Sequence, residues 1–217
     1  MSSSLESNPN VHVSSHPLVK HKISQLRDIN TKPKEFRDLL CGITNLLMYE
    51  ATKDFSLSDT EERTSPVSKY VGQEIKTSVA LVPILRSGLG LVNSALELLP
   101  EAHVFHLGLF REESSLQPVE YYNKLPPNAA VDECIILDPM VATGGTARVA
   151  IGILKEWGAT KITFVSVCGT ISGVKDIISH HPDVTIYLGS LDNEVNNKGF
   201  AVPGVGDSGD RIHNTLF

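Results

Sequence analysis

The feature that most constrains this fold is an alternation of short apolar runs with segments of helical periodicity, which begins near residue 78. Five apolar runs cover residues 78–85, 102–109, 134–137, 161–168 and 184–188. Apolar residues at helical spacing lie between or after them, over residues 89–99, 147–157 and 174–179. Because the runs are nearly continuous, they are typical of strands covered on both faces. The pattern predicts an α/β fold with a doubly wound parallel sheet of about five strands.

The chain before this alternation changes character twice. Residues 1–16 are rich in Ser and Asn, and we expect them to be disordered. Residues 36–47 carry apolar side chains at three- and four-residue spacing, which predicts an amphipathic helix with Pro33 near its first turn. The polar stretch 56–68 then contains Ser65-Pro66, which indicates a turn.

The strongest local motif is DPMVATGGT, residues 138–146, between an apolar run and a helix. Parallel sheets bind ligands outside the carboxyl ends of their strands, where this loop would lie. Gly144 and Gly145 let the backbone approach a ligand, and the helix from about Ala147 offers free N–H groups. Asp138 could accept hydrogen bonds from sugar hydroxyls. The loop therefore predicts a sugar-phosphate site, and the alternative is an ordinary strand–turn–helix connection capped by Thr.

Two arginines, Arg86 and Arg111, follow other apolar runs. A single arginine in such a place is usually a solvated charge. Two of them beside a phosphate loop favour anion binding, because the planar guanidinium matches phosphate oxygens. The polar stretch 112–132, which contains Tyr121 and Tyr122, is too long for a plain connection and predicts a lid or an arm.

Other motifs fail the test of their context. Residues 204–209 match G-x-G-x-x-G, but no clear strand precedes them and too few residues follow to build a dinucleotide-binding unit. The chain has no P-loop motif and no G-x-S-x-G motif. Its eight histidines show no metal-ligand spacing with Cys, Asp or Glu.

Composition narrows the class of protein further. A length of 217 residues corresponds to one domain, and a net charge of −6 argues against a nucleic-acid partner. The cysteines, Cys41, Cys134 and Cys168, form no C-x-x-C pair, which argues against a zinc ribbon and a disulfide framework. No apolar run is long enough to span a membrane, and the N-terminus lacks the apolar stretch of a signal peptide. We therefore expect a cytoplasmic protein without a membrane partner.

The block IILDPMVATGGT, residues 135–146, resembles the ribose-5-phosphate loop of type I phosphoribosyltransferases. Its D-P-M-x-A-T-G-G form is similar to that of the uracil phosphoribosyltransferase family. Further segments agree with that family and come in its order: HPLVKHKISQLRD (16–28), VPILRSGLG (82–90), GLFREE (108–113), PVEYYNKLP (118–126), HPDVTIY (181–187) and GFAVPGVGDSGDR (199–211). Three places differ from the family pattern: GTISG (169–173) replaces a loop richer in Ala and Pro, Ser208 replaces a small apolar residue, and the tail RIHNTLF (211–217) replaces one closer to Leu-Phe-Gly-Thr.

The resemblance implies a type I phosphoribosyltransferase-like fold in one domain, residues 17–217. Its core would cover about 78–190, and a small hood would be formed by about 191–217 with N-terminal elements. The implied activity converts uracil and 5-phosphoribosyl 1-pyrophosphate (PRPP) to UMP and pyrophosphate with Mg²⁺, in pyrimidine salvage. The resemblance also implies a homodimer or higher homo-oligomer, and some members of the family are activated by GTP.

The resemblance carries residue roles as well. Arg86 and Arg111 would contact PRPP, with Arg86 binding the pyrophosphate leaving group. Asp138 would hold the ribose hydroxyls, and Asp207 would lie near the sugar and the metal, reaching the metal only through water and PRPP. The implied catalytic residues are Arg86, Arg111, Asp138 and Asp207. The implied PRPP-binding set adds Pro139, Met140, Val141, Ala142, Thr143, Gly144, Gly145 and Thr146. Uracil would be read by Ala201, Gly206, Asp207 and Ser208, largely through backbone groups.

Two alternatives remain open at this point. The first is a regulatory or binding protein of the same fold that senses nucleotides, although retention of all four catalytic side chains argues against it. The second is a phosphoribosyltransferase for another base, because backbone geometry that decides base specificity leaves little trace in the sequence.

Overall fold

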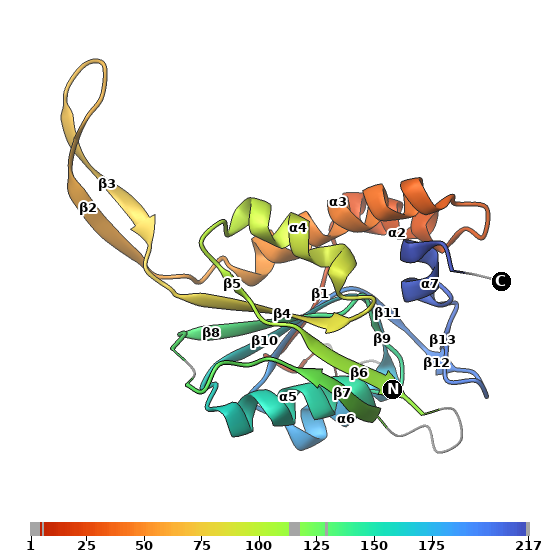
Figure 1. The fold of residues 1–217 in the computed structure, drawn as a ribbon. Coiled ribbons are helices and arrows are strands. Elements are labelled where there is room, and N and C mark those ends of the chain that lie inside the picture. Colours follow the sequence, from red (N-terminus) through yellow and green to blue (C-terminus); the bar gives the residue numbers. More distant parts are fainter. Residues whose placement is uncertain (1–4, 6, 113–117, 129, 216–217) are drawn as a thin grey trace.

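The computed structural model describes residues 5, 7–112, 118–128 and 130–215, with Arg111 described by its backbone alone. A mostly parallel sheet forms its centre, with strand order β1-β11-β10-β8-β4-β6-β7 (Figure 1). The five predicted runs become the main strands, and the predicted fold class is confirmed. These strands are β4 (Val79–Leu85), β6 (Leu107–Arg111), β8 (Glu133–Leu137), β10 (Ile162–Thr170) and β11 (Thr185–Asp192).

The sheet is larger than the predicted five strands because short strands extend it. Two of them, β5 (His103–Val104) and β9 (Met140–Val141), pair with β4 and β10. At one edge, β7 (Pro118–Asn123) runs antiparallel to β6, and at the other β1 (Val11–Val13) runs parallel to β11. Strands of two or three residues are too short to leave a periodic pattern in the sequence.

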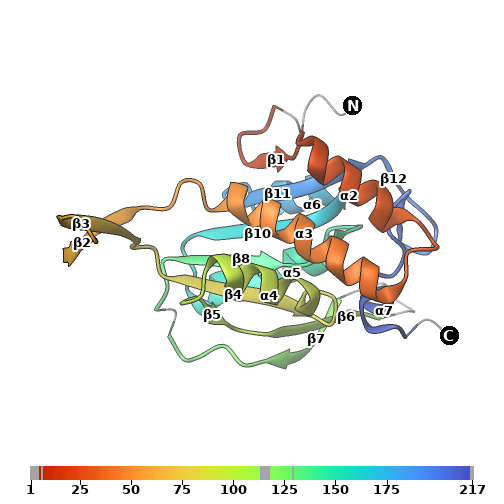
Figure 2. The same cartoon turned by 90° about the horizontal axis from the view of Figure 1, so that it is seen from above.

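Helices cover both faces of the sheet (Figures 1 and 2). One face carries α2 (Pro17–Arg27), α3 (Pro33–Ala51) and α4 (Leu89–Leu98), and the other carries α5 (Gly145–Trp157) and α6 (Ile171–His180). Successive residues of one strand face opposite apolar clusters: Leu81 packs toward the first layer, and Ala80 and Val82 toward the second. This two-sided burial explains why the strands read as continuous apolar runs.

The expectation of a disordered segment over residues 1–16 is wrong for its described part. Val11–Val13 forms β1 and pairs with Ile186–Leu188 of β11. The His12 ring stacks on Tyr187 at 4.6 Å between centroids, and Val11 is buried. The residues around Val11–Val13 are polar, so the sequence shows no strand pattern there. These three residues are ordered because they pair with β11, which is distant in the sequence. Residues 1–4 and 6 lie outside the described part of the chain.

The polar stretch after α3 forms a hairpin that projects from the body (Figure 1). Its strands are β2 (Leu57–Thr64) and β3 (Lys69–Ile75), which pair only with each other. The predicted turn is confirmed, because the Ser65 N–H donates to the Ser68 carbonyl at 2.8 Å. The strands were not predicted, because both of their faces are largely exposed, and the apolar residues Leu57, Tyr70, Val71 and Ile75 stand among polar ones without a regular alternation.

The C-terminal segment returns across the carboxyl edge of the sheet. It contains the small hairpin β12 (Glu194–Val195) and β13 (Ala201–Val202), followed by α7 (Ser208–His213). Ile212 of α7 belongs to the apolar cluster built by α2, α3 and α4. The C-terminal segment therefore packs against N-terminal elements. In the described part of the chain, no helix is both long and apolar enough to cross a membrane.

Candidate functional site

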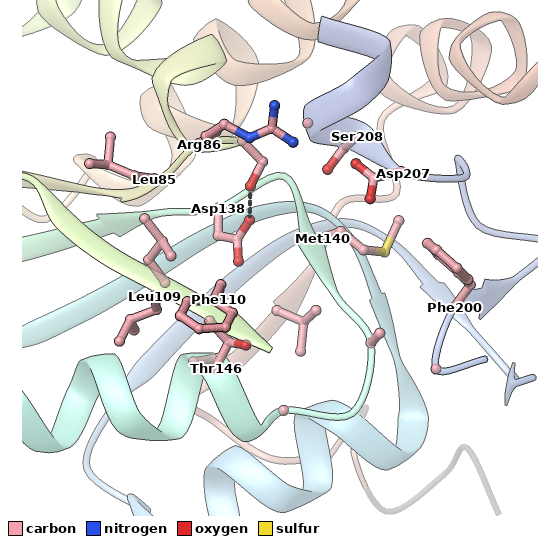
Figure 3. A pocket seen from close by; sticks show the side chains of 18 of the residues that line it. Leu85, Arg86, Leu109, Phe110, Asp138, Met140, Thr146, Phe200, Asp207 and Ser208 are labelled. Atoms are coloured by element: carbon pink, nitrogen blue, oxygen red, sulfur yellow. Dashed lines mark hydrogen bonds between the residues drawn. The ribbon is translucent and has the colours of Figure 1, made fainter. Parts of the chain in front are cut away.

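A cleft of about 1140 Å³ opens at the carboxyl ends of β4 and β8. From β4 the chain continues to β6 on one side, and from β8 it continues to β10 on the other side. The two connections diverge, and a crevice forms between them. The walls come from the segments after β4 and β8, from the β6–β7 hairpin and from the C-terminal segment (Figure 3). The described residues that line it include Arg86, Ser87, Leu109, Phe110, Tyr121, Asp138, Met140, Val141, Ala142, Gly144, Thr146, Lys198, Phe200, Gly206, Asp207 and Ser208.

Asp138 lies in the floor of this cleft, directly after β8. Its Oδ1 accepts a hydrogen bond of 2.9 Å from the Ser87 hydroxyl, which comes from the segment after β4 (Figure 3). Only 7% of the residue is exposed, and burial raises the pKa of its carboxyl group to about 7. The Ser87 hydroxyl and the Met140 backbone act against this rise in pKa. Ser87 thus orients an acceptor aimed at the cleft.

Arg86 directly follows β4, and its side chain extends toward α7 (Figure 3). Its Nη2 lies 3.0 Å from Asp210 Oδ1 in α7, and half of its side chain is exposed. A hydrogen bond of 2.7 Å from the Thr215 hydroxyl to the same oxygen holds Asp210 and helps to lower its pKa. The guanidinium of Arg86 therefore stands at the rim of the cleft, where an anion could replace Asp210 as its partner.

The glycine-rich loop after β9 leads into α5 with backbone groups turned to the cleft. Gly144 has φ +87°, and a Cβ there would lie 2.6 Å from the Gly173 carbonyl oxygen of α6. Gly144 is the N-cap residue of α5 and has no side chain to cap it, and the helix begins with Gly145 and Thr146. The first N–H groups of a helix and the positive end of its dipole can bind a phosphate.

A support behind this loop was not predicted from the sequence. The Thr170 hydroxyl donates to the Ala142 carbonyl at 2.5 Å and accepts from the Gly173 N–H at 3.0 Å. A Cβ at Gly173 would lie 2.3 Å from the Ala142 oxygen. Thr170 and Gly173 belong to the GTISG segment, residues 169–173. This segment caps α6 and holds the glycine-rich loop.

The C-terminal wall is the hood loop, which we define as residues 201–208. Gly206 has φ +73°, and Asp207 begins α7 by accepting a hydrogen bond of 2.9 Å from the Asp210 N–H. Figure 3 shows Asp207 and Ser208 at the side of the cleft opposite Leu109 and Phe110. The loop thus closes the cleft with glycine backbone and one carboxylate, which explains the dinucleotide-like motif that the sequence contains.

The structure brings most of the predicted site residues to this one cleft, but not all of them. The residues that line it are Arg86, Asp138, Met140, Val141, Ala142, Gly144, Thr146, Gly206, Asp207 and Ser208. Pro139, Thr143, Gly145 and Ala201 are not among its lining residues. Arg111 ends β6 next to the lining residue Phe110, and its side chain lies outside the described part of the chain.

Several lining residues were given no role in the site by the sequence, although Tyr121 lies in the stretch predicted to form a lid or an arm. Phe110 and Tyr121 stand on the β6–β7 hairpin with ring centroids 5.9 Å apart, and Lys198 and Phe200 stand on the C-terminal hairpin. The only signal for Phe200 is its place in GFAVPGVGDSGDR. Aromatic rings on two walls and a polar floor suit a flat, polar ligand joined to a charged one.

Magnesium fits this site through a substrate rather than through a protein cage. Within the described residues, no group of three or more His, Cys, Asp or Glu side chains could hold a metal ion. Asp138 and Asp207 both open on the cleft. Mg²⁺ keeps several waters and commonly binds through one or two carboxylates together with substrate phosphates, and this donor set matches that mode.

Comparison with known proteins gives consistent results. A family model described as uracil phosphoribosyltransferase matches residues 13–215. A uracil phosphoribosyltransferase of Roseiflexus castenholzii is 50% identical over 205 residues, 94% of this chain and 98% of the relative. That of Finegoldia magna is 47% identical over 206 residues, again 94% and 98%.

Solved structures agree with this result. One from Aquifex aeolicus has a TM-score of 0.88 at 35% identity and covers 94% of this chain and 97% of its own. An adenine phosphoribosyltransferase of Trypanosoma brucei shares the fold, with a TM-score of 0.54 at 12% identity and coverage of 86% and 85%.

Proposed function

This chain belongs to the uracil phosphoribosyltransferase family, and from this membership we propose that its cleft joins uracil to PRPP, giving UMP and pyrophosphate in pyrimidine salvage. The observation that carries the assignment to this cleft is the meeting of three distant charged groups. Arg86, Asp138 and Asp207 line one cleft beside the N-terminus of α5. An anionic sugar substrate and a flat base need these groups together.

The proposed arrangement of PRPP follows the charges. Its 5-phosphate binds the N–H groups at the start of α5 and the backbone of the loop through Gly144 and Thr146. Asp138, oriented by Ser87, accepts hydrogen bonds from the ribose hydroxyls. Arg86 leaves Asp210 and binds the pyrophosphate group, and Arg111 is proposed to assist it.

Catalysis then rests on stabilising the leaving group and holding the base in line. Charge develops on pyrophosphate in the transition state, and Arg86 is placed to offset it. The sugar becomes cation-like, so the carboxylates of Asp138 and Asp207 stabilise it electrostatically. Mg²⁺, held by PRPP and through water by Asp207, would add positive charge to the leaving group.

Uracil is proposed to bind under the hood loop, near Gly206, Asp207 and Ser208. The N–H and C=O groups of the backbone can pair with uracil O4 and N3–H, and a wrong base would leave buried polar groups unpaired. Ala201 is buried and does not line the cleft. Its proposed part in binding uracil is therefore to hold the hood loop from behind. A cytoplasmic location, a homo-oligomer and a GTP effector stay predictions.

The test measures pyrophosphate release from PRPP and Mg²⁺ with uracil, cytosine, orotate, hypoxanthine and adenine in turn. Release with uracil alone is expected. Release with another base would retain the phosphate site and overturn the assignment of the hood loop. Binding of PRPP without release with any base would favour a nucleotide-sensing protein instead.

A further inference from the structure

A nearly buried ion pair lies behind the hood loop and outside the cleft. Arg27 ends α2, and Asp192 ends β11, so the pair joins the N-terminal helices to the carboxyl edge of the sheet. The contact is bidentate, with Nη1 2.9 Å from Oδ2 and Nη2 2.5 Å from Oδ1. The Asp192 side chain is 4% exposed and that of Arg27 is 20% exposed. Such a planar fork fixes direction as well as distance.

Both members of the pair also hold the same residue of the hood loop. Arg27 Nη1 donates to the Gly204 carbonyl at 2.8 Å, and the Gly204 N–H donates to Asp192 Oδ2 at 3.0 Å. Gly204 has φ +58°, and a Cβ there would lie 2.2 Å from the Ala201 carbonyl oxygen. The backbone of Gly204 is therefore fixed at both of its polar groups in a conformation that favours glycine.

A second arginine continues this attachment along the loop. Arg211 Nη1 donates to the carbonyl groups of Val205 and Leu26, both at 2.8 Å. Its guanidinium stands 4.3 Å from the centre of the Phe36 ring in α3. Consecutive residues of the loop, Gly204 and Val205, are thus tied to the C-terminal end of α2.

The tied residues lie between the positions proposed to read the base. Gly204 follows Ala201 by three residues and precedes Gly206 by two. Recognition by backbone groups depends on their placement to within about 0.5 Å, because no flexible side chain can compensate. Neither Arg27 nor Asp192 lines the cleft. Any influence on substrate must therefore pass through the loop.

We propose that Arg27 and Asp192 are positioning residues that set the backbone of the hood loop for recognition of the base, an inference that rests on the proposed function. The pair acts on the base rather than on PRPP, because its contacts reach the hood loop and not the glycine-rich loop of residues 142–146. Asp192 also orients the loop independently of charge, through its acceptor bond with the Gly204 N–H.

The test replaces Arg27 by Lys and, separately, Asp192 by Asn. R27K keeps the charge but replaces the planar fork by a single ammonium group, which loses the bidentate geometry with Asp192. D192N keeps the shape and loses charge on the acceptor. We expect the KM for uracil to rise about tenfold in each, with the KM for PRPP changed by less than about twofold.

The control is another ion pair with a buried carboxylate, at the amino ends of the strands. Glu133 at the start of β8 is 1% exposed, and its Oε2 lies 2.7 Å from the Nζ of Lys161, whose side chain is 57% exposed. K161M breaks that pair and should lower the melting temperature without changing the KM for uracil. The comparison separates loss of stability from loss of base positioning.

Equal rises of both KM values in R27K and D192N, or a rise of the uracil KM in K161M as well, would overturn the positioning role. Hydrogen exchange of residues 201–208 supplies a readout that does not need turnover. If the wild-type protein does not release pyrophosphate with uracil, the proposed function fails. In R27K, a larger increase over the wild-type exchange rate for residues 201–208 than for residues 142–146 would still support the positioning role. Exchange unchanged from wild type would overturn it.

Discussion

At the scale of single residues, Asp138 serves two opposed requirements. The proposed reaction needs its carboxylate, whereas burial raises the pKa of that group to about 7 and so favours the neutral acid. The unfolded chain, with a pKa near 3.8, binds fewer protons than the folded one between about pH 4 and pH 7. Stability contributed by this residue is therefore present at acidic pH and decreases as pH rises through this window.

Replacement of Asp138 by Asn tests this conflict. The variant stays neutral, so wild-type protein should lose about 3 kcal/mol more unfolding free energy than D138N between pH 5 and pH 8. Denaturant unfolding at both pH values measures the difference. At pH 8, kcat/KM for PRPP should fall roughly 100-fold in D138N, because the ribose loses a charged acceptor. Parallel pH dependence of unfolding in both proteins would contradict the raised pKa.

Asp207 permits a cleaner separation of charge from folding. Its side chain caps α7, and Asn caps helices about as well as Asp. D207N should therefore unfold within about 0.5 kcal/mol of wild type. Its turnover with uracil should decrease at least about tenfold, because the cation-like sugar loses a nearby negative charge. Steady-state kinetics beside denaturant unfolding measure both, and normal turnover would remove Asp207 from the mechanism.

At the scale of elements, the phosphate loop depends on a close approach of α5 and α6. Gly144 faces the carbonyl oxygen of Gly173, and Gly173 faces that of Ala142, which also accepts a hydrogen bond from Thr170. A side chain at either glycine would meet a carbonyl oxygen rather than a movable group. The position of the loop is thus set by the start of α6, an element that does not touch the phosphate in the proposed complex.

Replacement of Gly173 by Ala should move the loop through this contact. The new methyl group would displace the Ala142 carbonyl, and the KM for PRPP should rise about tenfold while the KM for uracil changes little. G152A is the control, because a Cβ at Gly152 in α5 meets nothing within 4 Å. We expect G152A to gain about 0.5–1 kcal/mol of stability at unchanged KM. An unchanged KM for PRPP in G173A would show that the loop does not need this buttress.

Elements also show what a sequence can predict and what it cannot. The strands β4, β8, β10 and β11 were predictable because both of their faces are buried, and α5 was predictable from its periodicity and from Gly158 at its end. The hairpin β2–β3 was not, because both faces are largely exposed. Within the site, DPMVATGGT is local and visible. Ser87 and Phe200 reach the cleft, and Asp210 reaches Arg86, only after folding brings distant segments together.

At the scale of the whole molecule, two parts differ in their dependence on the core. The sheet is enclosed between two apolar clusters, one under α2, α3 and α4 and one under α5 and α6. The β2–β3 hairpin projects from the end of the sheet opposite the cleft (Figure 1). Its ion pairs, Lys69–Glu62 and Arg63–Glu74, join its own two strands.

Replacement of residues 58–74 by Asn-Gly, which can join the paired ends Leu57 and Ile75, tests the independence of this hairpin. If the protein is a monomer, we expect the far-ultraviolet circular dichroism of the helices to persist in this variant. The melting temperature should then change by about 2 °C or less. Sedimentation should be measured alongside. A lower assembly mass would place the hairpin in the predicted subunit contact, whereas loss of fold in an isolated chain would contradict its independence.

The attachment of Gly204 to Arg27 also has a consequence for synthesis on the ribosome. Arg27 is made 165 residues before Asp192, and β1 likewise awaits β11. Chains emerge from the N-terminus, so α2 can pack against α3 early, whereas Arg27 must remain without Asp192 and Gly204 until nearly the whole protein has been made. The glycine-rich loop for the phosphate is made about 60 residues earlier than the hood loop. A chain released before residue 204 would contain the segment proposed to bind the sugar phosphate and lack the one proposed to present the base.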